Sequence, residues 1–327
     1  MVKIAVIGAG LSGLTVAHRL QSVADVTLFE KSRGVGGRIA TRYADPHRFD
    51  HGAQFFIAKS QAFRDFLQPL IEQGVVQMWH ARFAEFVGSD MLRCSQWNEE
   101  KPHYVGVPGM NAIGKYLAAD LSIQTQTTVA RCIHDGRWQL WDDHDQHLGH
   151  FDWVVVTTPV SQAIDLIPND VVSAWQLSEV HMQACFSLML GFVETVDLPF
   201  DAALVREADI SWISVNSNKP GRDKAYTLLV HSTNAWADRH IDDNQADVRA
   251  YLSEQTHRVT GLDVSQANYV DLHAWRYANI GRQHRSIAID THKQIAACGD
   301  WTIQGRVEAA FTSASAIADK MIACLSG

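Results

Sequence analysis

A glycine-rich turn between two short apolar runs constrains this chain more than any other feature. Residues Gly8–Gly13 read G-A-G-L-S-G, after an apolar run at Lys3–Ile7 and at the start of a helix-like segment at Leu11–Leu20. A second run, Val26–Glu30, ends on an acid twenty residues after the second glycine of the turn. This order of strand, turn, helix and strand predicts a parallel βαβ unit with a right-handed crossover.

The same turn is suited to bind a dinucleotide. Gly8, Gly10 and Gly13 allow a tight turn and a close approach of backbone to pyrophosphate, and the helix offers N–H groups and the positive end of its dipole. We expect Ser12, in the same turn, to contact the cofactor as well. Glu30 can accept hydrogen bonds from a ribose 2′-OH and would repel a 2′-phosphate. A glycine-rich turn without a ligand is the alternative, and the surrounding strand, helix and acid argue against it.

A basic, glycine-rich segment follows Glu30 directly. Residues 33–42 read R-G-V-G-G-R-I-A-T-R. Glycines such as Gly37 let backbone pack near a dinucleotide, and the planar donor fork of Arg38 suits pyrophosphate oxygens. A basic surface loop is the alternative, but the position straight after the ribose-binding acid favours the cofactor.

A third motif lies near the end of the chain. Cys298–Trp301 read C-G-D-W, and a helix-like segment starts near Val307. Asp300, beside glycine at a strand end, is suited to hold a ribityl hydroxyl or a phosphate-side group of a cofactor. By itself the motif also fits an ordinary strand, turn and capped helix, so it gains its meaning from the other two.

Composition and charge limit the remaining classes of protein. The formal net charge of -8 disfavours nucleic acid and anionic membranes as partners, since both favour a basic face. The five cysteines form no C-x-x-C pair, which indicates reduced thiols in the cytosol. No apolar run reaches the roughly 20 residues of a membrane span, and the chain begins on a strand without an export signal. We therefore expect a soluble, cytoplasmic protein.

Sixteen histidines suggest a metal site at first sight. None of them stands in a helical H-x-x-x-H pattern with an acid, so no metal is predicted.

Apolar patterning predicts the other elements. We expect further helices at 60–74, 110–121, 244–259 and 307–325, and strands within 75–94 and at 138–141, 151–157, 186–192, 210–215, 226–231 and 294–298. The run W-V-V-V at 153–156 is typical of a strand covered on both faces.

The predicted fold class is α/β with an α+β second lobe. A Rossmann-like dinucleotide-binding domain with a parallel sheet is expected at 1–60, 105–160 and 286–327. A substrate domain with a mainly antiparallel sheet is expected at 61–104 and 161–285. The two domains are expected to be interleaved, because a strand, a turn and a helix follow one another in the same order at both ends of the chain.

The segments above resemble the amine-oxidase-like FAD oxidoreductases, and over its whole length the chain resembles their bacterial-type renalases. The resemblance is carried by Ile4–Glu30, Gly36–Thr41, Phe49–Phe56, Val107–Met110, His231–Thr233 with Trp236, Trp275–Ala278 and Cys298–Trp301. Ala309 and Ala314 stand where relatives often have glycine, a departure that concerns how closely this helix approaches the flavin.

The resemblance decides for FAD rather than NAD as the bound dinucleotide. No cysteine is positioned by motif for covalent attachment, so noncovalent FAD is expected. Lys31, Ala53, Gln54, Phe55 and Val129 are expected to complete the cofactor site. The helix that begins with Val307 and Glu308 is expected to stabilise negative charge on the pyrimidine part of the reduced flavin.

The resemblance also implies an activity: oxidation of the 2- and 6-dihydro isomers of NAD(P) to NAD(P)⁺, with hydride transfer to flavin N5 and reoxidation by O₂ to H₂O₂. His231, Trp275 and Gln54 are the residues expected to touch substrate or flavin. Phe55 and Phe56 can wall a flat ring, although one or both can equally be core. No protein partner is implied.

Two other classes stay open. A flavin amine oxidase or a related desaturase would use the same cofactor on another substrate. A non-catalytic binding protein with the same fold would lack turnover altogether.

Overall fold

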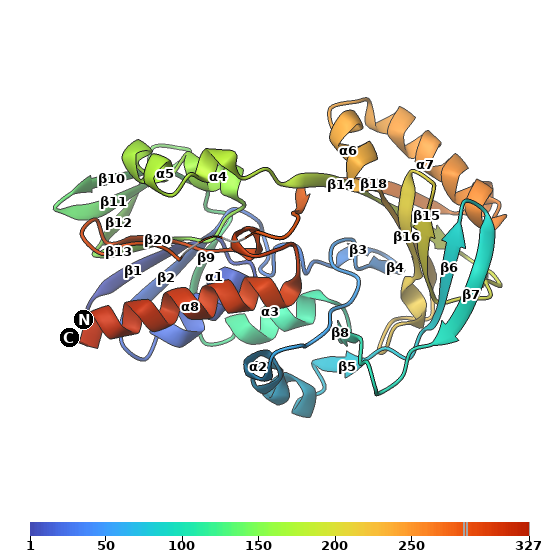
Figure 1. Cartoon of the computed structure of the whole chain (residues 1–327), viewed down its shortest axis with the longest axis horizontal. Helices are drawn as coiled ribbons and strands as arrows, with labels where there is room; N and C mark the ends of the chain where they lie inside the picture. Colours follow the sequence, from blue (N-terminus) through green and yellow to red (C-terminus); the bar gives the residue numbers. More distant parts are fainter. Residues whose placement is uncertain (284, 286, 327) are drawn as a thin grey trace. The chain divides into compact units, whose positions relative to one another are not determined.

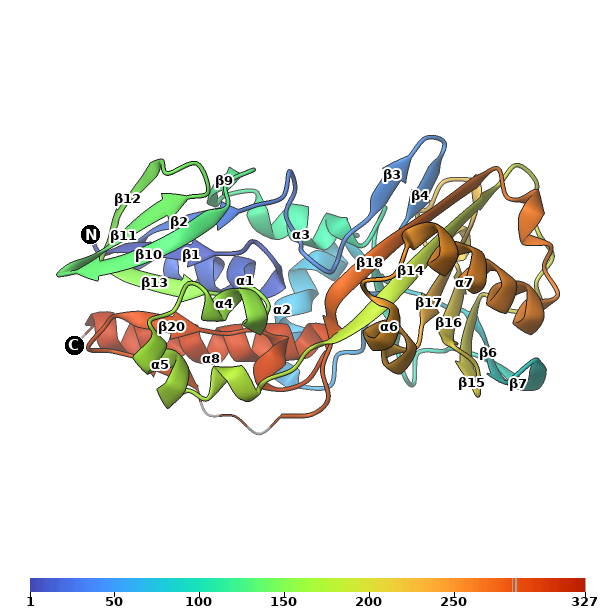
Figure 2. The ribbon, with the colours of Figure 1, turned by 90° about the horizontal axis from the view of Figure 1, so that it is seen from above.

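The chain divides into two interleaved compact units. The computed structural model describes residues 1–283, 285 and 287–326. Unit 1 comprises Met1–Ile39, Gly114–Met182 and Asn279–Gly327, and unit 2 comprises Ala40–Ile113 and Gln183–Ala278. Figure 1 and Figure 2 show the ribbon with its elements labelled.

Unit 1 contains a six-stranded sheet, a three-stranded sheet and several helices. Its elements are β1 (Lys3–Ile7), α1 (Leu11–Leu20), β2 (Asp25–Glu30), β9 (Ser122–Thr125), β10 (Val129–Asp135), β11 (Arg137–Asp142), β12 (His147–Phe151), β13 (Trp153–Val156), α4 (Val160–Ile164), α5 (Asn169–Ala174), η1 (Leu177–Glu179), β19 (Ala288–Asp290), β20 (Ile295–Ala297), η4 (Asp300–Thr302) and α8 (Val307–Ser326). Helix α3 (Asn111–Ala118) crosses from unit 2 into unit 1.

The six-stranded sheet positions the glycine turn. Its strand order is β19-β20-β13-β1-β2-β9, and all neighbours run parallel except β19, which is antiparallel to β20. Strand β13 is buried along its whole length, as its continuous valines predict. Helix α8 lies alongside α1 (Figure 1), where Arg19 of α1 pairs with Asp319 of α8 at 2.5 Å. The glycine turn therefore lies at the carboxyl end of a central strand.

Unit 2 is built around a seven-stranded sheet. Its elements are β3 (Arg42–Ala44), β4 (His47–Phe49), α2 (Gln61–Glu72), β5 (Val76–Met78), β6 (Arg82–Val87), β7 (Asp90–Gln96), β8 (Tyr104–Gly106), β14 (Gln183–Phe192), β15 (Ala202–Arg206), β16 (Ile210–Val215), η2 (Asn216–Asn218), β17 (Tyr226–Ser232), α6 (Asn234–His240), α7 (Gln245–Thr260), η3 (Val264–Gln266) and β18 (Tyr269–Asn279). The strand order is β18-β14-β17-β16-β15-β6-β7, and β15 pairs in parallel with β6.

The two faces of this sheet differ in character. One face packs its alternate apolar residues into a core with α6 and α7, including Phe186, Val230 and Ile213. Because side chains alternate across a strand, the residues between them, such as Ser187, His231 and Trp212, belong to the opposite face. The pairs Ser187↔His231 and Trp212↔His231 place these three side chains in one row across β14, β17 and β16.

The fold class agrees with the sequence prediction. A Rossmann-like unit with a parallel sheet and a mainly antiparallel second sheet are both present. The predicted helix at 60–74 is α2, and Ser60 caps it by accepting a hydrogen bond from the Phe63 N–H at 3.2 Å. Strand β18 and the short helices α4, α5 and α6 were not predicted. In the part of the chain that the structure describes, no helix combines the length and apolar composition of a membrane span.

The unit boundaries differ from those expected at four places. Residues 40–60 and 105–113 belong to unit 2, and residues 161–182 and 279–285 to unit 1. Packing explains two of these differences. Phe49 joins Met189 and Leu229 in a small core of unit 2, while the apolar side chains of α4, α5 and η1 join the strand core of unit 1.

Candidate functional site

The two glycine loops of unit 1 lie directly against each other. Gly10 and Gly36 form an isolated parallel bridge, and the Gly36 N–H donates to the Ala9 carbonyl at 2.8 Å. A Cβ on Gly37 would lie 3.2 Å from the Gly10 Cα, and Gly37 has a φ of +54°. A Cβ on Gly13 would collide with the Gly8 carbonyl. These glycines therefore permit the close packing of loop on loop and of helix on strand.

The carboxylate of Glu30 is held in place at the end of β2. It is buried, and its two oxygens accept hydrogen bonds from the Ala9 and Ser32 N–H groups, each at 2.8 Å. Each oxygen keeps capacity for a second hydrogen bond. The acid is thus fixed beside the glycine turn, where a ribose diol would need an acceptor.

Arg38 and Asp300, predicted separately to bind the cofactor, are paired with each other. The two terminal nitrogens of Arg38 contact the two oxygens of Asp300 at 2.9 and 2.5 Å. Asp300 is almost fully buried and Arg38 about one third exposed. This bidentate pair joins residue 38 to residue 300, and a pyrophosphate that takes the fork of Arg38 has to compete with Asp300 for it.

The other predicted cofactor residues of unit 1 have varied surroundings. The Ser12 hydroxyl donates to the Ala310 carbonyl of α8 at 3.1 Å, and exposed Lys31 lies 3.4 Å from the Gln162 side chain. Val129 is buried in the core of unit 1 at the start of β10. Val307 and Glu308 form the first turn of α8, as expected.

The sequence prediction missed Thr157 and Thr158, which follow β13. The Thr157 hydroxyl bonds the Ile7 and Gly8 carbonyls at 2.9 and 2.8 Å, so it fixes the entry to the glycine turn. The Thr158 hydroxyl oxygen is buried without a partner among the described residues. Their position at the carboxyl end of a strand parallel to β1 was the available signal, since ligands of such sheets bind there.

The loops of unit 1 fit a bound dinucleotide. A Cβ on Gly10 would meet no atom within 4 Å, so backbone at the start of α1 is open to a ligand. Gly10 caps α1 without a side-chain acceptor, which leaves the N–H groups of the first turn to other acceptors. The orphaned hydroxyl of Thr158 adds a hydrogen-bonding group that a ligand can satisfy.

In unit 2, the D-H-G-A-Q-F-F segment contacts the sheet face opposite α6 and α7. The His51 ring stacks on Trp275 with centroids 5.2 Å apart, and the Trp275 indole N–H donates to the His51 carbonyl at 2.7 Å. The Gln54 side-chain oxygen accepts from the Ser214 hydroxyl of β16 at 2.8 Å. The side chain of His231 also forms a hydrogen bond with the backbone of His51. His231 and Trp275, both predicted to touch substrate or flavin, thus contact the same segment.

The histidines of this face are uncharged at neutral pH. Burial lowers the pKa of His51 to about 3, with further contributions from His273 and Arg42. Burial also lowers the pKa of His231 to about 4 and shifts that of His273 downward. The face therefore presents neutral imidazoles beside an indole ring.

The side-chain amide of Gln54 has all its hydrogen bonds within the protein. Its amide nitrogen donates to the Asp50 and Gly52 carbonyls, and its oxygen accepts from Ser214 and from the Lys219 ammonium at 3.1 Å. These four contacts use the whole hydrogen-bonding capacity of the amide. A hydrogen bond from Gln54 to flavin or substrate would require one of them to open.

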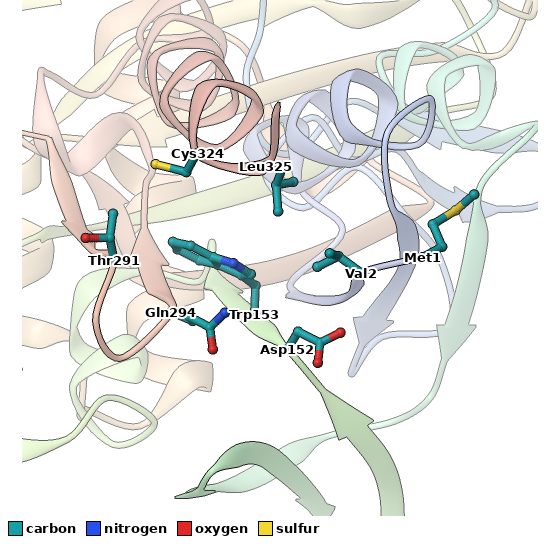
Figure 3. Close-up of a pocket in the computed structure, with 8 residues that line it drawn as sticks. All are labelled: Met1, Val2, Asp152, Trp153, Thr291, Gln294, Cys324 and Leu325. Atoms are coloured by element: carbon teal, nitrogen blue, oxygen red, sulfur yellow. The ribbon is translucent and has the colours of Figure 1, made fainter. Parts of the chain in front are cut away.

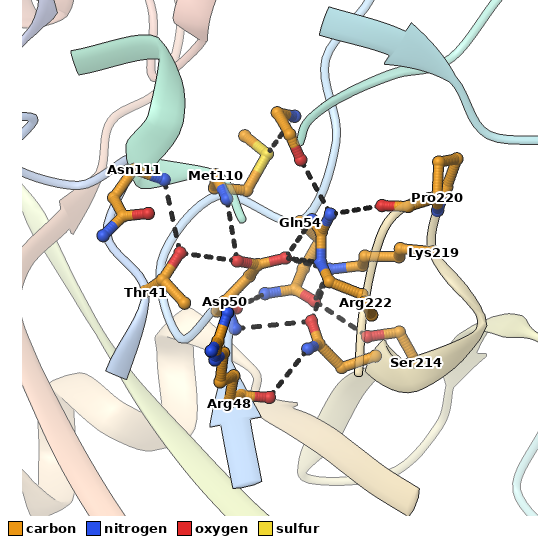
Figure 4. Close-up of polar contacts among 12 residues, drawn as sticks. Thr41, Arg48, Asp50, Gln54, Met110, Asn111, Ser214, Lys219, Pro220 and Arg222 are labelled. Carbon is orange, nitrogen blue, oxygen red and sulfur yellow. Dashed lines mark hydrogen bonds and ion pairs between the residues drawn. The ribbon is translucent and has the colours of Figure 1, made fainter. Parts of the chain in front are cut away.

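Gln54 belongs to a buried ion cluster that sequence analysis did not find (Figure 4). Asp50 accepts from Arg222 at 2.6 Å and from Lys219 at 3.3 Å on one oxygen, and from the Thr41 hydroxyl and Met110 N–H on the other. Burial alone would raise the pKa of Asp50, but the two cations hold it below its usual value. Burial lowers the pKa of Lys219 to about 8.

Of the two adjacent phenylalanines, one is a core residue and the other is only half-buried. Phe56 is buried beside Phe63 and Tyr104, so it is core. Phe55 is half-buried and contacts Trp212 at 5.3 Å and Trp97 at 5.0 Å between ring centroids. Ala53, next to it, is also half-buried.

Trp236, one of the residues that carry the resemblance, lies on the other side of the sheet from His231. It is buried in the core on the helix side of the sheet and stacks on Tyr251 at 5.1 Å. Thr233 caps α6 by accepting from the Trp236 N–H. This tryptophan therefore supports the fold rather than the face that carries His231.

One open cavity of about 690 Å³ lies in unit 1, lined by Met1, Val2, Asp152, Trp153, Thr291, Gln294, Cys324 and Leu325 (Figure 3). Val2, Asp152 and Gln294 directly precede β1, β13 and β20, so the cavity lies at the amino ends of these strands, away from the glycine turn. Ligands of open parallel sheets bind at the carboxyl ends, and we do not assign the cofactor to this cavity. Within the described residues, no group of three His, Cys, Asp or Glu side chains is placed to hold a metal ion.

Comparison with known families defines the class of this protein. The model of the flavin containing amine oxidoreductases matches residues 77–322, and that of an NAD(P)-binding Rossmann-like domain matches residues 6–70. The first match covers well over half of the chain. The chain therefore belongs to the flavin-containing amine oxidoreductase family, and its class is that of a flavin-dependent oxidoreductase.

Individual relatives are more distant. The 4,4′-diapophytoene desaturases of Staphylococcus aureus strains Newman and USA300 are 51% identical over 51 residues, which is 15% of this chain and 10% of theirs. The chain thus matches only about a tenth of the length of these curated relatives.

Solved structures share the fold over almost the whole chain. A protein of Exiguobacterium sp. 255-15, provisionally named a protoporphyrinogen oxidase, has a TM-score of 0.77 at 11% identity, with 98% of each chain covered. Wild-type putrescine oxidase bound to putrescine has a TM-score of 0.68 at 11% identity, covering 98% of this chain and 99% of that one. At such identities the likeness concerns the fold alone.

Proposed function

We propose that this protein is an FAD-dependent, renalase-type oxidase of the 2- and 6-dihydro isomers of NAD(P). The observation that carries the proposal is the uncharged aromatic face of unit 2, where His51, His231 and His273 are held neutral beside Trp275. A dihydropyridine is an electron-rich ring that becomes aromatic when it gives up a hydride. Its oxidation therefore needs orientation by stacking more than it needs a protein base.

The cofactor in this proposal is noncovalent FAD held by unit 1. Glu30 would accept hydrogen bonds from the adenosine ribose, and the glycine loops with the start of α1 would hold the pyrophosphate. Burial raises the pKa of the Cys298 thiol to about 12, as it does for Cys185 and Cys132. These thiols are therefore poor nucleophiles for a covalent flavin bond.

FAD, when bound, supplies the hydride acceptor at N5 and passes the two electrons to O₂, which leaves as H₂O₂ after taking up one further proton. The residues of this chain would contribute binding and orientation. Trp275 is held by its bond to the His51 carbonyl, so its ring has a fixed orientation against which a substrate ring can stack. The ring N–H of neutral His231 is taken up by the His51 backbone, so Nε2, which is buried without a partner among the described residues, can accept one hydrogen bond from a carboxamide N–H without adding charge.

Oxidation of an amine is the second candidate, and membership in the amine oxidoreductase family favours it. An amine substrate has to lose a proton before it gives up a hydride. The face described above holds neutral imidazoles whose conjugate acids are strong, so they are weak bases for this task.

The test is the visible flavin absorbance of the purified protein under anaerobic conditions, before and after addition of 6-dihydro-NAD. We expect rapid bleaching, with the colour and one equivalent of H₂O₂ appearing on admission of air. Bleaching by putrescine or benzylamine, but not by 6-dihydro-NAD, would replace the proposal by an amine oxidase. A colourless protein that takes up no FAD would point to a non-catalytic member of the fold.

A further inference from the structure

The buried cluster of unit 2 contains one more cation than it needs for charge balance. The side chains of Asp50, Lys219 and Arg222 are exposed by 0, 0 and 2%. One carboxylate thus faces two cations, and Arg222 already forms the shorter contact with it, at 2.6 Å against 3.3 Å for Lys219. Burial of a second ammonium is costly, so its presence calls for a role other than neutralising Asp50.

The contacts of Lys219 indicate that role. Its ammonium lies 2.9 Å from the Asn216 side-chain oxygen and 3.1 Å from the Gln54 side-chain oxygen. An ammonium has three donors and no acceptor. It can therefore face only the oxygen end of each amide, and this restricts which way round both amides lie.

The opposite ends of the two amides hold the backbone of residues 48–52. The Gln54 nitrogen donates to the Asp50 and Gly52 carbonyls, and the Asn216 nitrogen donates to the Arg48 carbonyl at 3.0 Å. The Asn216 oxygen also accepts from the Asp50 N–H at 3.3 Å. A reversed amide would place oxygen against these carbonyls and repel them. Figure 4 shows Lys219 and the Gln54 amide beside Asp50.

The Ser214 hydroxyl, which also contacts the Gln54 amide, does not restrict the orientation of that amide. Ser214 donates to the Gln54 oxygen at 2.8 Å, but a hydroxyl can donate or accept. It would tolerate either orientation of the amide. Lys219 is the side chain of this cluster that requires an oxygen from both amides, and it acts together with the backbone groups that the amides contact.

We propose that Lys219 is a positioning residue, whose ammonium fixes the orientation of the Gln54 and Asn216 amides and through them the backbone that carries His51. This backbone in turn fixes Trp275, whose indole N–H donates to the His51 carbonyl. The consequence for turnover rests on the proposed function, because it assumes that Trp275 orients the substrate ring. The effect of Lys219 on the backbone of residues 48–52 does not depend on the proposed function.

The charge state of Lys219 provides a second signature. The groups that face it are Asp50, Arg222, the more distant neutral His231 and the ring of Trp79, 5.4 Å from the ammonium nitrogen. A deprotonated Lys219 has a lone pair and can accept from a reversed amide. Because its pKa is lowered to about 8, the wild-type protein should lose amide orientation, and with it kcat/KM, as the pH rises through this value.

The experiment compares Lys219→Met, Gln54→Glu and Lys224→Met, all loaded with FAD. Lys219→Met removes the ammonium but keeps most of the volume. Gln54→Glu adds a second carboxylate, which balances the charge of the cluster but removes the donors to the Asp50 and Gly52 carbonyls. Lys224→Met removes an exposed lysine of the same loop and serves as control.

Amide hydrogen exchange over residues 48–56 and kcat with 6-dihydro-NAD are the two readouts. We expect Lys219→Met and Gln54→Glu each to speed local exchange and lower kcat by about tenfold or more, with Lys224→Met unchanged. Lys219→Met should also lose the fall of kcat/KM above pH 8. Unchanged local exchange in Lys219→Met, or exchange raised equally over all of unit 2, would overturn the positioning role.

Failure of the proposed function gives a different result. If wild-type protein with FAD does not oxidise 6-dihydro-NAD, the substrate assignment falls. The exchange data on the same samples still decide whether Lys219 positions residues 48–52.

Discussion

Replacing Asp50 by asparagine tests whether a single carboxylate holds the ion cluster of unit 2 together. Asp50→Asn keeps the shape of the side chain but removes the one negative charge that, among the described residues, pairs with Lys219 and Arg222. Both cations stay buried, at 0 and 2% exposure. Breaking a buried ion pair by removing one partner costs about 3–5 kcal/mol, which is a large share of the roughly 5–15 kcal/mol that stabilises a folded protein.

Loss of the Lys219 proton can reduce the cost of this substitution, so we expect a loss of stability near the lower end of this range. The pKa of Lys219 is already lowered to about 8, and loss of Asp50 removes the charge that keeps it from falling further. Lys219 can then lose its proton at pH 7 and relieve part of the repulsion. Arg222 cannot do so. We therefore expect a loss of about 3 kcal/mol in the free energy of unfolding.

The assay is a urea titration at pH 7 with saturating FAD, followed by tryptophan fluorescence. The matched control is Asp223→Asn, which breaks the half-exposed pair of Arg48 with Asp223 at 2.8 Å. Such surface pairs contribute about 0–1 kcal/mol. The double variant Asp50→Asn with Lys219→Met should regain part of the loss, because one unpaired cation is removed with it. If Asp50→Asn costs no more than Asp223→Asn, the carboxylate does not hold the cluster and the reasoning fails.

Three further predictions concern the cofactor loops and the neutral histidines. Glu30→Gln should weaken FAD binding about 10- to 100-fold in a fluorescence titration, because hydrogen bonds to a charged acceptor contribute about 1.5–3 kcal/mol. Gly13→Ala should cost at least about 1–3 kcal/mol of stability and most FAD binding, because its Cβ would collide with the Gly8 carbonyl. The folded-state pKa values of His51 and His231, about 3 and 4, lie below the unfolded value of about 6.5. The unfolded chain therefore binds more protons, so stability should be complete above pH 6.5 and decline as the pH falls towards 4.

Each of these three has its own control. Glu30→Gln also replaces one of the two oxygens that accept from the Ala9 and Ser32 N–H groups, so thermal stability is measured with and without FAD. A loss without FAD as large as the loss with FAD would assign Glu30 to folding instead. Gly34→Ala, at a loop glycine with open space around it, should be tolerated where Gly13→Ala is not. His231→Asn should show a shallower decline of melting temperature between pH 6.5 and 4.5 than wild type. An identical decline would mean that His231 is not the titrating group.

Local order along the chain explains which features the sequence predicted. The βαβ opening, the glycine turn and Glu30 lie within thirty consecutive residues, and hydrogen bonding along a short segment determines their arrangement. The unbroken apolar run at Trp153–Val156 predicted a buried strand, and this strand is buried along its whole length. The helix after Ser60 carried its own cap. In these cases the residues that determine the local structure lie in the same segment as that structure.

The tertiary structure alone decided which distant residues meet. Lys219 and Asn216 lie more than 160 positions from Asp50, and no local pattern marks them as partners of a buried carboxylate. Trp236 and Trp275 both stand in segments that carry the family resemblance, but Trp236 lies in α6 within the helix-covered core, whereas Trp275 lies in β18 and stacks on His51. A sequence determines each strand's pattern. Which face turns to which partner depends on the register between strands, and that is set only when the whole sheet packs.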